Sequence, residues 1–276
     1  MRFSICNEIY EGWDFARTCA DVAACGYDGI EIAPFTIDDD PGRIAEDQAR
    51  RIGRIALDAG LQVSGLHWLL ARPPGMHITT ADDAVRTRTV EFAQHLARLA
   101  AAMGAAVMVW GSPKQRDVPD GEDHAAAFDR AADAICQVCR VAGPLGVTIA
   151  LEPLGPAETN FMVYAHDTVR LMKAIDHPAC RLHLDVKAMS QEPHPVSQVI
   201  IQNAQHLAYF HANDANRRGP GFGDTDFVAI GAALRQINYD GWVSVEVFDY
   251  KPDPQTIARR SIEHLKVCAG LDSHGP

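Results

Sequence analysis

Short apolar runs alternate along the chain with longer stretches in which apolar residues recur every three or four positions. Short apolar runs are typical of strands buried in a parallel sheet, and the longer period is typical of amphipathic helices. In the stretch 43–59, for example, Ile52, Ile55 and Ala59 fall on one helical face. The predicted strands are residues 3–6, 29–33, 62–67, 106–110, 147–152, 181–185, 206–211 and 242–246. The predicted helices are residues 13–25, 43–59, 81–103, 122–141, 166–175, 196–202, 226–236 and 253–268.

Eight strand–helix units predict an α/β protein with a single (β/α)₈ barrel, the TIM barrel, over residues 1–276. Such a barrel takes about 250 residues, and no linker or break in composition divides this chain. An open doubly wound sheet is the alternative. Its glycine-rich phosphate turn would follow the first strand, where this chain has Asn7-Glu8-Ile9-Tyr10 instead. The sequence therefore favours the closed barrel.

Charged or imidazole side chains end the last four predicted strands: Glu152, Asp185, His211 and Glu246. The C-terminal ends of barrel strands meet at one face, where these folds hold their active sites. Three carboxylates near one another need a cation to stay ionised, although each one alone is also compatible with a salt bridge. Three oxygen donors and one imidazole predict one divalent metal ion, with Mn²⁺ expected first and Mg²⁺, Co²⁺ or Zn²⁺ as alternatives.

Four further residues are candidates for substrate contacts or support. His67 ends the third strand and is expected to bond a substrate hydroxyl, the alternative being a histidine packed under a loop. Trp110 and, less so, Trp68 are expected to stack on a sugar or to roof the pocket. Glu31 ends the second strand and is expected to orient a ligand or the substrate. Each of these positions is predicted to face the same end of the barrel.

Charge and composition exclude several classes of partner. The net charge is −11 and the isoelectric point is near 5.5, so the surface repels phosphate backbones and we expect no nucleic-acid partner. No run of about 18 apolar residues occurs, so no membrane span is expected. An acidic residue within the first ten positions and the lack of a long apolar stretch there argue against a secretory signal.

The seven cysteines are scattered and odd in number, which fits a reducing cytoplasm better than a disulfide framework. Cys136 and Cys139 form a C-x-x-C pattern inside a predicted helix. That context favours two ordinary helix cysteines over a redox motif or half of a zinc site. A cytoplasmic location is therefore predicted.

The C-terminal half contains five short motifs that carry a family resemblance. They are Leu151-Glu152-Pro153, His183-Leu184-Asp185, His211-Ala212-Asn213-Asp214 with Arg217, Gly219-Pro220-Gly221-Phe222-Gly223, and Val245-Glu246. Together they resemble the xylose isomerase-like barrel superfamily, and within it the sugar phosphate isomerase/epimerase group that includes the ketose 3-epimerases. The resemblance runs from the first strand to the last and is specific only after residue 147.

The resemblance implies roles for particular residues. It implies that Glu152, Asp185, His211 and Glu246 bind the metal and that the two glutamates are the acid–base residues. It also implies that Glu158 and Arg217 contact the substrate; an arginine in that glycine-rich loop is suited to clamp a hydroxyl, carboxylate or phosphate, although a solvated loop arginine is the alternative.

One position departs from that family. Ketose 3-epimerases usually carry a histidine three residues after the aspartate ligand, and this chain has Ala188 there. Lys187 is expected to take over part of the substrate contact, or else the substrate differs.

The implied function is a metal-dependent isomerase or epimerase of a small sugar or sugar phosphate, working through a metal-stabilised enediolate. Glutamates on both faces of that intermediate give epimerisation, and a single shuttling glutamate gives aldose–ketose isomerisation. The alternatives are an inosose-type dehydratase or lyase, an endonuclease IV-like nuclease, and a non-catalytic sugar-binding barrel. Barrels of this group often self-associate, so a homodimer or homotetramer is expected.

Overall fold

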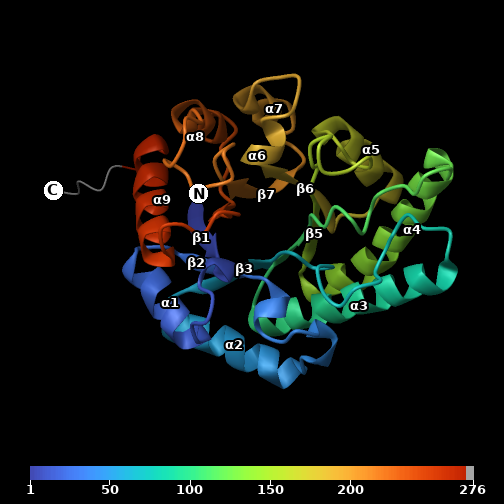
Figure 1. Ribbon diagram of the computed structural model, residues 1–276, viewed down its shortest axis with the longest axis horizontal. Helices are drawn as coiled ribbons and strands as arrows, with labels where there is room; N and C mark the ends of the chain where they lie inside the picture. The colour runs from blue at the N-terminus through green and yellow to red at the C-terminus, as the bar shows by residue number, and fades with distance from the viewer. Residues whose placement is uncertain (272–276) are drawn as a thin grey trace.

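Eight parallel strands close into a barrel in the order in which they occur along the chain (Figure 1). The computed structural model describes residues 1–271. The strands are β1 (Arg2–Cys6), β2 (Gly29–Ile32), β3 (Gln62–Leu66), β4 (Val107–Trp110), β5 (Thr148–Leu151), β6 (Cys180–Asp185), β7 (Leu207–Ala212) and β8 (Trp242–Val245). Pairing of β1 with β8, from Arg2–Trp242 to Ile5–Val245, closes the ring. The predicted barrel is confirmed; its predicted last residues, 272–276, lie outside the described part.

Helices surround the barrel, as the ring of coiled ribbons in Figure 1 shows. They are α1 (Phe15–Ala24), α2 (Glu46–Asp58), α3 (Asp83–Met103), α4 (His124–Ala142), α5 (Ala165–Ile175), α6 (Val186–Met189), α7 (Val196–Gln202), α8 (Phe227–Gln236) and α9 (Pro254–Cys268). Aspartates begin several of them by accepting an N–H of the first turn, among them Asp82 and Asp253. Within residues 1–271, no helix is long and apolar enough to cross a membrane.

Short elements that the apolar pattern did not predict follow several strands and loops. The four-residue α6 begins directly after β6, and the 3-10 turn η1 (Asn7–Ile9) begins directly after β1. Three more 3-10 turns are η2 (Pro34–Thr36), η3 (Pro41–Arg43) and η4 (Gly143–Leu145). Both α6 and η1 place additional residues at the C-terminal end of the barrel, next to the strand ends.

The apolar core has two layers, and the strands alternate between them. The barrel interior holds a small cluster of Val107, Val109, Ala150, Tyr209 and Trp242. The larger cluster lies between strands and helices and includes the neighbours Met108 and Trp110. Side chains along a strand point alternately toward the barrel axis and toward the helices. A residue at a strand end therefore faces the axis only if it lies an even number of positions from another inward-facing residue of that strand.

All seven cysteines are free thiols. Cys136 and Cys139 lie in α4, as the helical pattern predicts.

Candidate active site

The side chains of Glu152, Asp185, His211 and Glu246 come together at the C-terminal ends of the last four strands. Glu152 directly follows β5, Asp185 ends β6, His211 lies in β7 and Glu246 directly follows β8. One possible ligand atom from each lies within 4.8 Å of those of the other three, and all four residues are buried. A set of three carboxylates and one imidazole has the composition that a divalent ion such as Mn²⁺ or Mg²⁺ accepts.

The charges in this group are those of a site that needs a cation. Burial, together with Asp185 and Glu246, raises the pKa of Glu152 to about 8. Burial and the charge of Glu246 raise the pKa of Asp185 to about 6. For Glu246, burial raises the pKa, but the imidazole of His211 outweighs burial and the net shift is downward. A divalent ion would offset both the burial and the mutual repulsion that raise the pKa values of Glu152 and Asp185, so the residues present fit such an ion.

His211 is held in place by a carboxylate on each side. Its Nδ1 lies 3.1 Å from Glu246 Oε2, and its Nε2 lies 3.0 Å from Glu31 Oε2. Glu31 is fully buried and also accepts a hydrogen bond of 3.0 Å from the Tyr209 hydroxyl. Burial raises the pKa of Glu31, but His211 and His67 lower it more, so this carboxylate is ionised. A carboxylate behind a histidine is the usual device that fixes the ring of a metal ligand.

Asp185 is fixed through its backbone surroundings. Its Oδ1 accepts the N–H of Ala188 at 2.7 Å, and its Oδ2 accepts an N–H of the buried Asn213 side chain. Asn213 Oδ1 in turn accepts the backbone N–H of Lys187 at 2.7 Å. The start of α6 is thereby tied to the residue directly after β7, and the orientation of the aspartate is set before any ligand binds.

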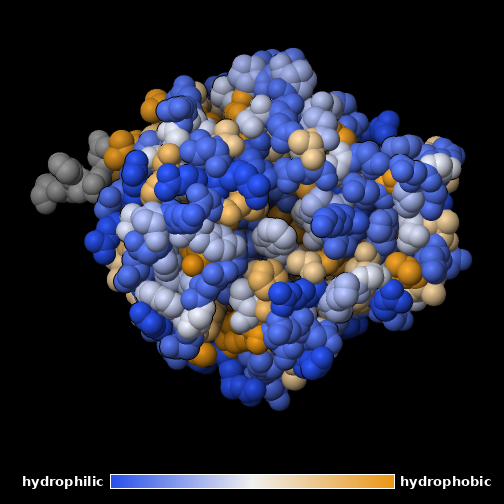
Figure 2. All heavy atoms as spheres, viewed as in Figure 1, coloured by the Kyte–Doolittle hydropathy of each residue, from blue (hydrophilic) through white to orange (hydrophobic). Residues whose placement is uncertain are grey.

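A cavity that opens to solvent lies in front of this group, with about 460 Å³ of empty space when its open mouth is included. Figure 2 shows a hollow near the middle of the ring of helices. Six of the residues predicted from the sequence line the cavity, namely His67, Trp68, Glu152, Glu158, Lys187 and Glu246.

Two ion pairs stand in the cavity wall. Lys187 Nζ lies 2.8 Å from Glu158 Oε1 and 4.4 Å from the centre of the Phe248 ring. Burial lowers the pKa of Lys187, but Asp185 and Glu158 outweigh burial and raise it. His67 Nε2 lies 3.0 Å from Glu8 Oε2.

His67 lies almost completely inside the protein. Burial lowers its pKa, but the charges of Glu8 and Glu31 outweigh burial and raise it to about 9. These shifts favour the charged forms of His67 and Lys187 at neutral pH, and the cavity presents polar walls to a ligand.

Trp110 does not line the cavity, so the structure places its ring away from the substrate position predicted for it. The cavity is lined by Val109, which points inward, and Trp110 is buried in the layer between barrel and helices. The sequence of β4 is apolar throughout, so no change from apolar to polar residues reveals which side of the strand faces inward. Trp68, the weaker candidate, does line the cavity.

Arg217 lies at the edge of the site rather than in its wall. It is exposed, and its guanidinium lies 5.5 Å from the centre of the Phe248 ring, which lines the cavity. The carbonyl oxygen of Arg217 accepts the N–H of Phe248 at 2.9 Å. The arginine loop is therefore attached to the segment after β8.

Two residues that the sequence did not single out shape the site. Arg116 is fully buried and donates to the carbonyl oxygens of Glu152 (2.6 Å), Trp110 (3.2 Å) and Ser112 (3.2 Å). Burial lowers its pKa to about 10. Gly111 lines the cavity so closely that a Cβ there would overlap Glu152 Oε2. Both lie in a polar loop in which an arginine and a glycine are ordinary residues, so no signal in the sequence marked them.

Comparison with known proteins identifies the family to which this chain belongs. A family model described as "Xylose isomerase-like TIM barrel" matches residues 19–268. The L-ribulose 3-epimerase of Methylomonas sp. (strain DH-1) is 27% identical over 236 residues, covering 84% of this chain and 78% of the relative. The L-ribulose 3-epimerase of Mesorhizobium japonicum is 26% identical over 253 residues, covering 90% of this chain and 80% of the relative.

Solved structures agree in fold. A crystal structure of D-psicose 3-epimerase in the presence of D-fructose superposes with a TM-score of 0.86 at 22% identity, covering 98% of this chain and 100% of that chain. A structure of L-ribulose 3-epimerase gives a TM-score of 0.85 at 24% identity, covering 100% of this chain and 99% of that chain. At these identities the similarity shows that the same barrel is present.

Proposed function

We propose, from the premise that this chain belongs to the xylose isomerase-like TIM barrel family, that it is a metal-dependent epimerase of a small ketose. The predicted isomerase class is confirmed, since the relatives that match it are sugar epimerases. One observation carries the finer proposal. One possible ligand atom from each of three carboxylates and one imidazole lies within 4.8 Å of the others, and two of these residues, Glu152 and Glu246, line the cavity.

In this proposal Glu152, Asp185, His211 and Glu246 hold the metal ion, with Mn²⁺ expected and Mg²⁺, Co²⁺ or Zn²⁺ as alternatives. When bound, such an ion supplies polarisation of the substrate carbonyl and stabilisation of the enediolate charge. Glu31 keeps the His211 ring in position from behind.

Glu152 and Glu246 are the proposed acid–base pair. Both line the cavity, and they follow β5 and β8, which are three strands apart in the ring. Their carboxylates therefore approach a bound substrate from different sides. One glutamate takes the proton from the carbon next to the carbonyl, and the other returns a proton to the opposite face. These two proton transfers invert the configuration of one carbon and leave the connectivity of the sugar unchanged.

The substrate contacts are proposed for four residues: Glu158, Lys187, His67 and Arg217. The Glu158–Lys187 pair offers both an acceptor and a donor to hydroxyl groups, and it stands beside Ala188, where a histidine is usual in the family. The Lys187 charge is matched by Glu158, which favours a neutral sugar over a phosphate at this wall. The relatives carry the names L-ribulose and D-psicose 3-epimerase, in line with an unphosphorylated ketose.

The test is proton exchange at carbon. The chain loaded with Mn²⁺ is incubated in D₂O with a panel of ketoses, aldoses and inososes, and deuterium uptake is followed by NMR. We expect uptake at C3 of a ketose, lost in Glu152→Gln and in Glu246→Gln and kept in Glu91→Gln, an exposed helix variant. Unchanged exchange in both active-site variants contradicts the acid–base roles. Exchange followed by loss of water from an inosose identifies a dehydratase instead.

A further inference from the structure

We infer that the barrel has a second metal site, for a thiophilic divalent ion such as Zn²⁺, formed by Cys6, Glu8, His67 and Glu246 beside the proposed catalytic ion. The inference concerns metal binding alone and does not depend on which sugar is the substrate.

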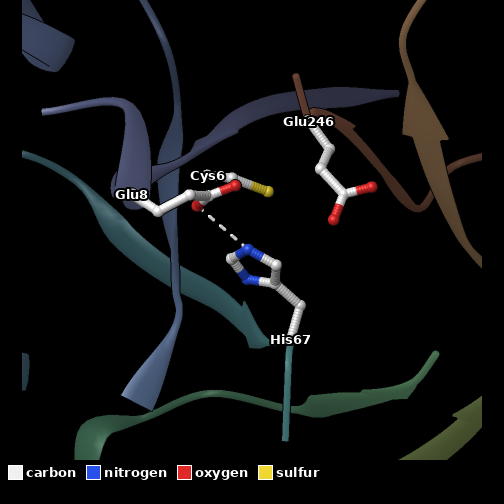
Figure 3. A group of neighbouring side chains, drawn as sticks. All are labelled: Cys6, Glu8, His67 and Glu246. Atoms are coloured by element: carbon white, nitrogen blue, oxygen red, sulfur yellow. Dashed lines mark hydrogen bonds and ion pairs between the residues drawn. The ribbon is translucent and has the colours of Figure 1, made fainter. Parts of the chain in front are cut away.

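The residues of this second site come from three strand ends and one turn (Figure 3). Cys6 ends β1, Glu8 lies in η1, His67 directly follows β3 and Glu246 directly follows β8. One possible ligand atom from each lies within 4.8 Å of those of the others. Figure 3 shows Glu8 beside His67, with the Cys6 sulfur directed toward the side on which Glu246 lies. Four ligands bound to one zinc ion lie about 3.3–3.8 Å apart, so side-chain adjustment brings these atoms to bonding positions.

An unsatisfied polar atom points to a missing ligand. The side chain of Glu8 is 4% exposed and that of His67 is 1% exposed. Nevertheless Glu8 Oε1 has no hydrogen-bond partner among the described residues. A buried carboxylate oxygen without a partner is unfavourable, and a cation bound to it removes that cost. Nothing in the proposed reaction uses Glu8 Oε1.

Glu31 supports both histidines from behind. Its carboxylate lies 3.7 Å from His67 Nδ1 and 3.0 Å from His211 Nε2. With its Nδ1 on this side, His67 presents Nε2 to Glu8 and to the space between the ligands. One glutamate therefore stands behind both histidines, within hydrogen-bond distance of His211 and within ion-pair distance of His67.

The two sites differ in chemistry. The site proposed for catalysis has three carboxylates and an imidazole, which suits Mn²⁺ or Mg²⁺. The second site adds a thiolate, which selects softer ions such as Zn²⁺ or Co²⁺. Glu246 belongs to both groups and has two oxygens with which to bridge the ions. The alternative is a buried thiol in a polar network, since Cys6 Sγ also lies 3.4 Å from Glu31 Oε2.

Cobalt titration of the metal-free chain distinguishes the two explanations. Metal content is measured by mass spectrometry, and absorption is recorded in the near ultraviolet, where cobalt bound to thiolate shows a charge-transfer band. We expect two equivalents of Co²⁺, with the band tracking one of them and disappearing when Zn²⁺ is added. A single equivalent, or two equivalents without the band, overturns the inference.

Variants assign the equivalents to the two sites. Cys6→Ser should lose the band and keep one equivalent, whereas Cys19→Ser, at a buried cysteine in α1, should keep the band and both equivalents. Glu8→Gln leaves the thiol in place and should weaken the band-forming equivalent at least tenfold. Asp185→Asn should lose only the equivalent without the band. A band that survives Cys6→Ser, or an equal loss of both equivalents in Glu8→Gln, contradicts the second site.

Discussion

The two halves of the barrel supply the cavity in different ways. In the half formed by β5 to β8, the proposed ligands are the last residue of a strand, the residue directly after one, or the residue one before its end. In the half formed by β1 to β4, the polar groups sit on a strand end, in the turn η1 and after β3, and β4 contributes the apolar Val109. In the β5–β8 half, the ligands lie at or next to strand ends, a pattern that can be read from the sequence. In the β1–β4 half, the positions of the polar groups depend on local turns. Polar residues at strand ends can therefore be recognised from the sequence, whereas those in the turns that follow strands become evident only in the folded chain.

The largest expected effect is a difference in rate between a variant in the β5–β8 half and a variant in the β1–β4 half. Glu246→Gln should lower kcat by on the order of 10²–10⁴-fold, because a positioned acid or base contributes that much. His67→Gln, in the other half, should change kcat/KM by only about tenfold. Steady-state kinetics with the best ketose of the panel provide the measurement. If kcat fell by the same factor in the two variants, the β1–β4 half would also take part in proton transfer.

A methyl group on Gly111 should displace Glu152. The added Cβ overlaps the Glu152 carboxylate, so Gly111→Ala should lower kcat by about 10²-fold while the chain still folds. Gly143→Ala, where the nearest atom to the new Cβ is a flexible His177 ring atom at 3.1 Å, is the matched control. Kinetics and thermal melting together make the test, and normal kcat in Gly111→Ala would show that Glu152 has room to move.

Replacing the buried Arg116 tests the junction of the halves, since this side chain joins the carbonyl of Trp110 in β4 to that of Glu152 after β5. Arg116→Met should lower the free energy of unfolding by about 3 kcal/mol, because three buried carbonyl oxygens lose their donors. Urea denaturation gives the value, with the exposed Arg98→Met as control. A change below about 1 kcal/mol would indicate that water replaces the guanidinium.

Metal removal should abolish turnover and also lower stability. A metal ion whose free concentration is about 100 times its Kd stabilises the native state by about 2.7 kcal/mol. Removing it by chelation should therefore lower Tm by roughly 5–10 °C. Calorimetry before and after chelation, and after Mn²⁺ is added back, measures this shift. Asp185→Asn should show a much smaller shift, and a shift as large as that of the unmodified chain would place the stabilising ion elsewhere.

The smallest effect distinguishes the two tryptophans. Trp68→Ala should raise KM about tenfold with little change in kcat, because its ring lines the cavity. Trp110→Phe should leave KM unchanged, because that ring packs between barrel and helices. A rise of KM in Trp110→Phe would mean that packing behind β4 controls the shape of the cavity.

The fold was predictable from the sequence because long stretches such as 83–103 repeat their apolar pattern over many turns. The turn η1 and the four-residue α6 are too short to show a period, so the sequence left them out. The group of Glu152, Asp185, His211 and Glu246 was predictable because charged residues at the ends of apolar strands are unusual. The structure brings these four together.

Other parts of the site could not be predicted from the sequence, because they depend on how strands and loops are oriented in the folded chain. The direction of Trp110 depends on the alternation of an all-apolar strand, which sequence alone does not reveal. Arg116 is buried although its loop is polar, since the loop folds back over the strand ends. The Glu8–His67 pair joins residues 59 positions apart, and only closure of the barrel shows that they meet.

The pairing of β1 with β8 has a consequence for the newly made protein. Glu246 belongs to both four-residue ligand groups and lies directly after the last strand. A growing chain therefore cannot offer a complete set of ligands at either position until that strand has left the ribosome and joined the first. Ion uptake would then be a step that follows synthesis, and the cell's free metal at that moment would decide which ion is retained.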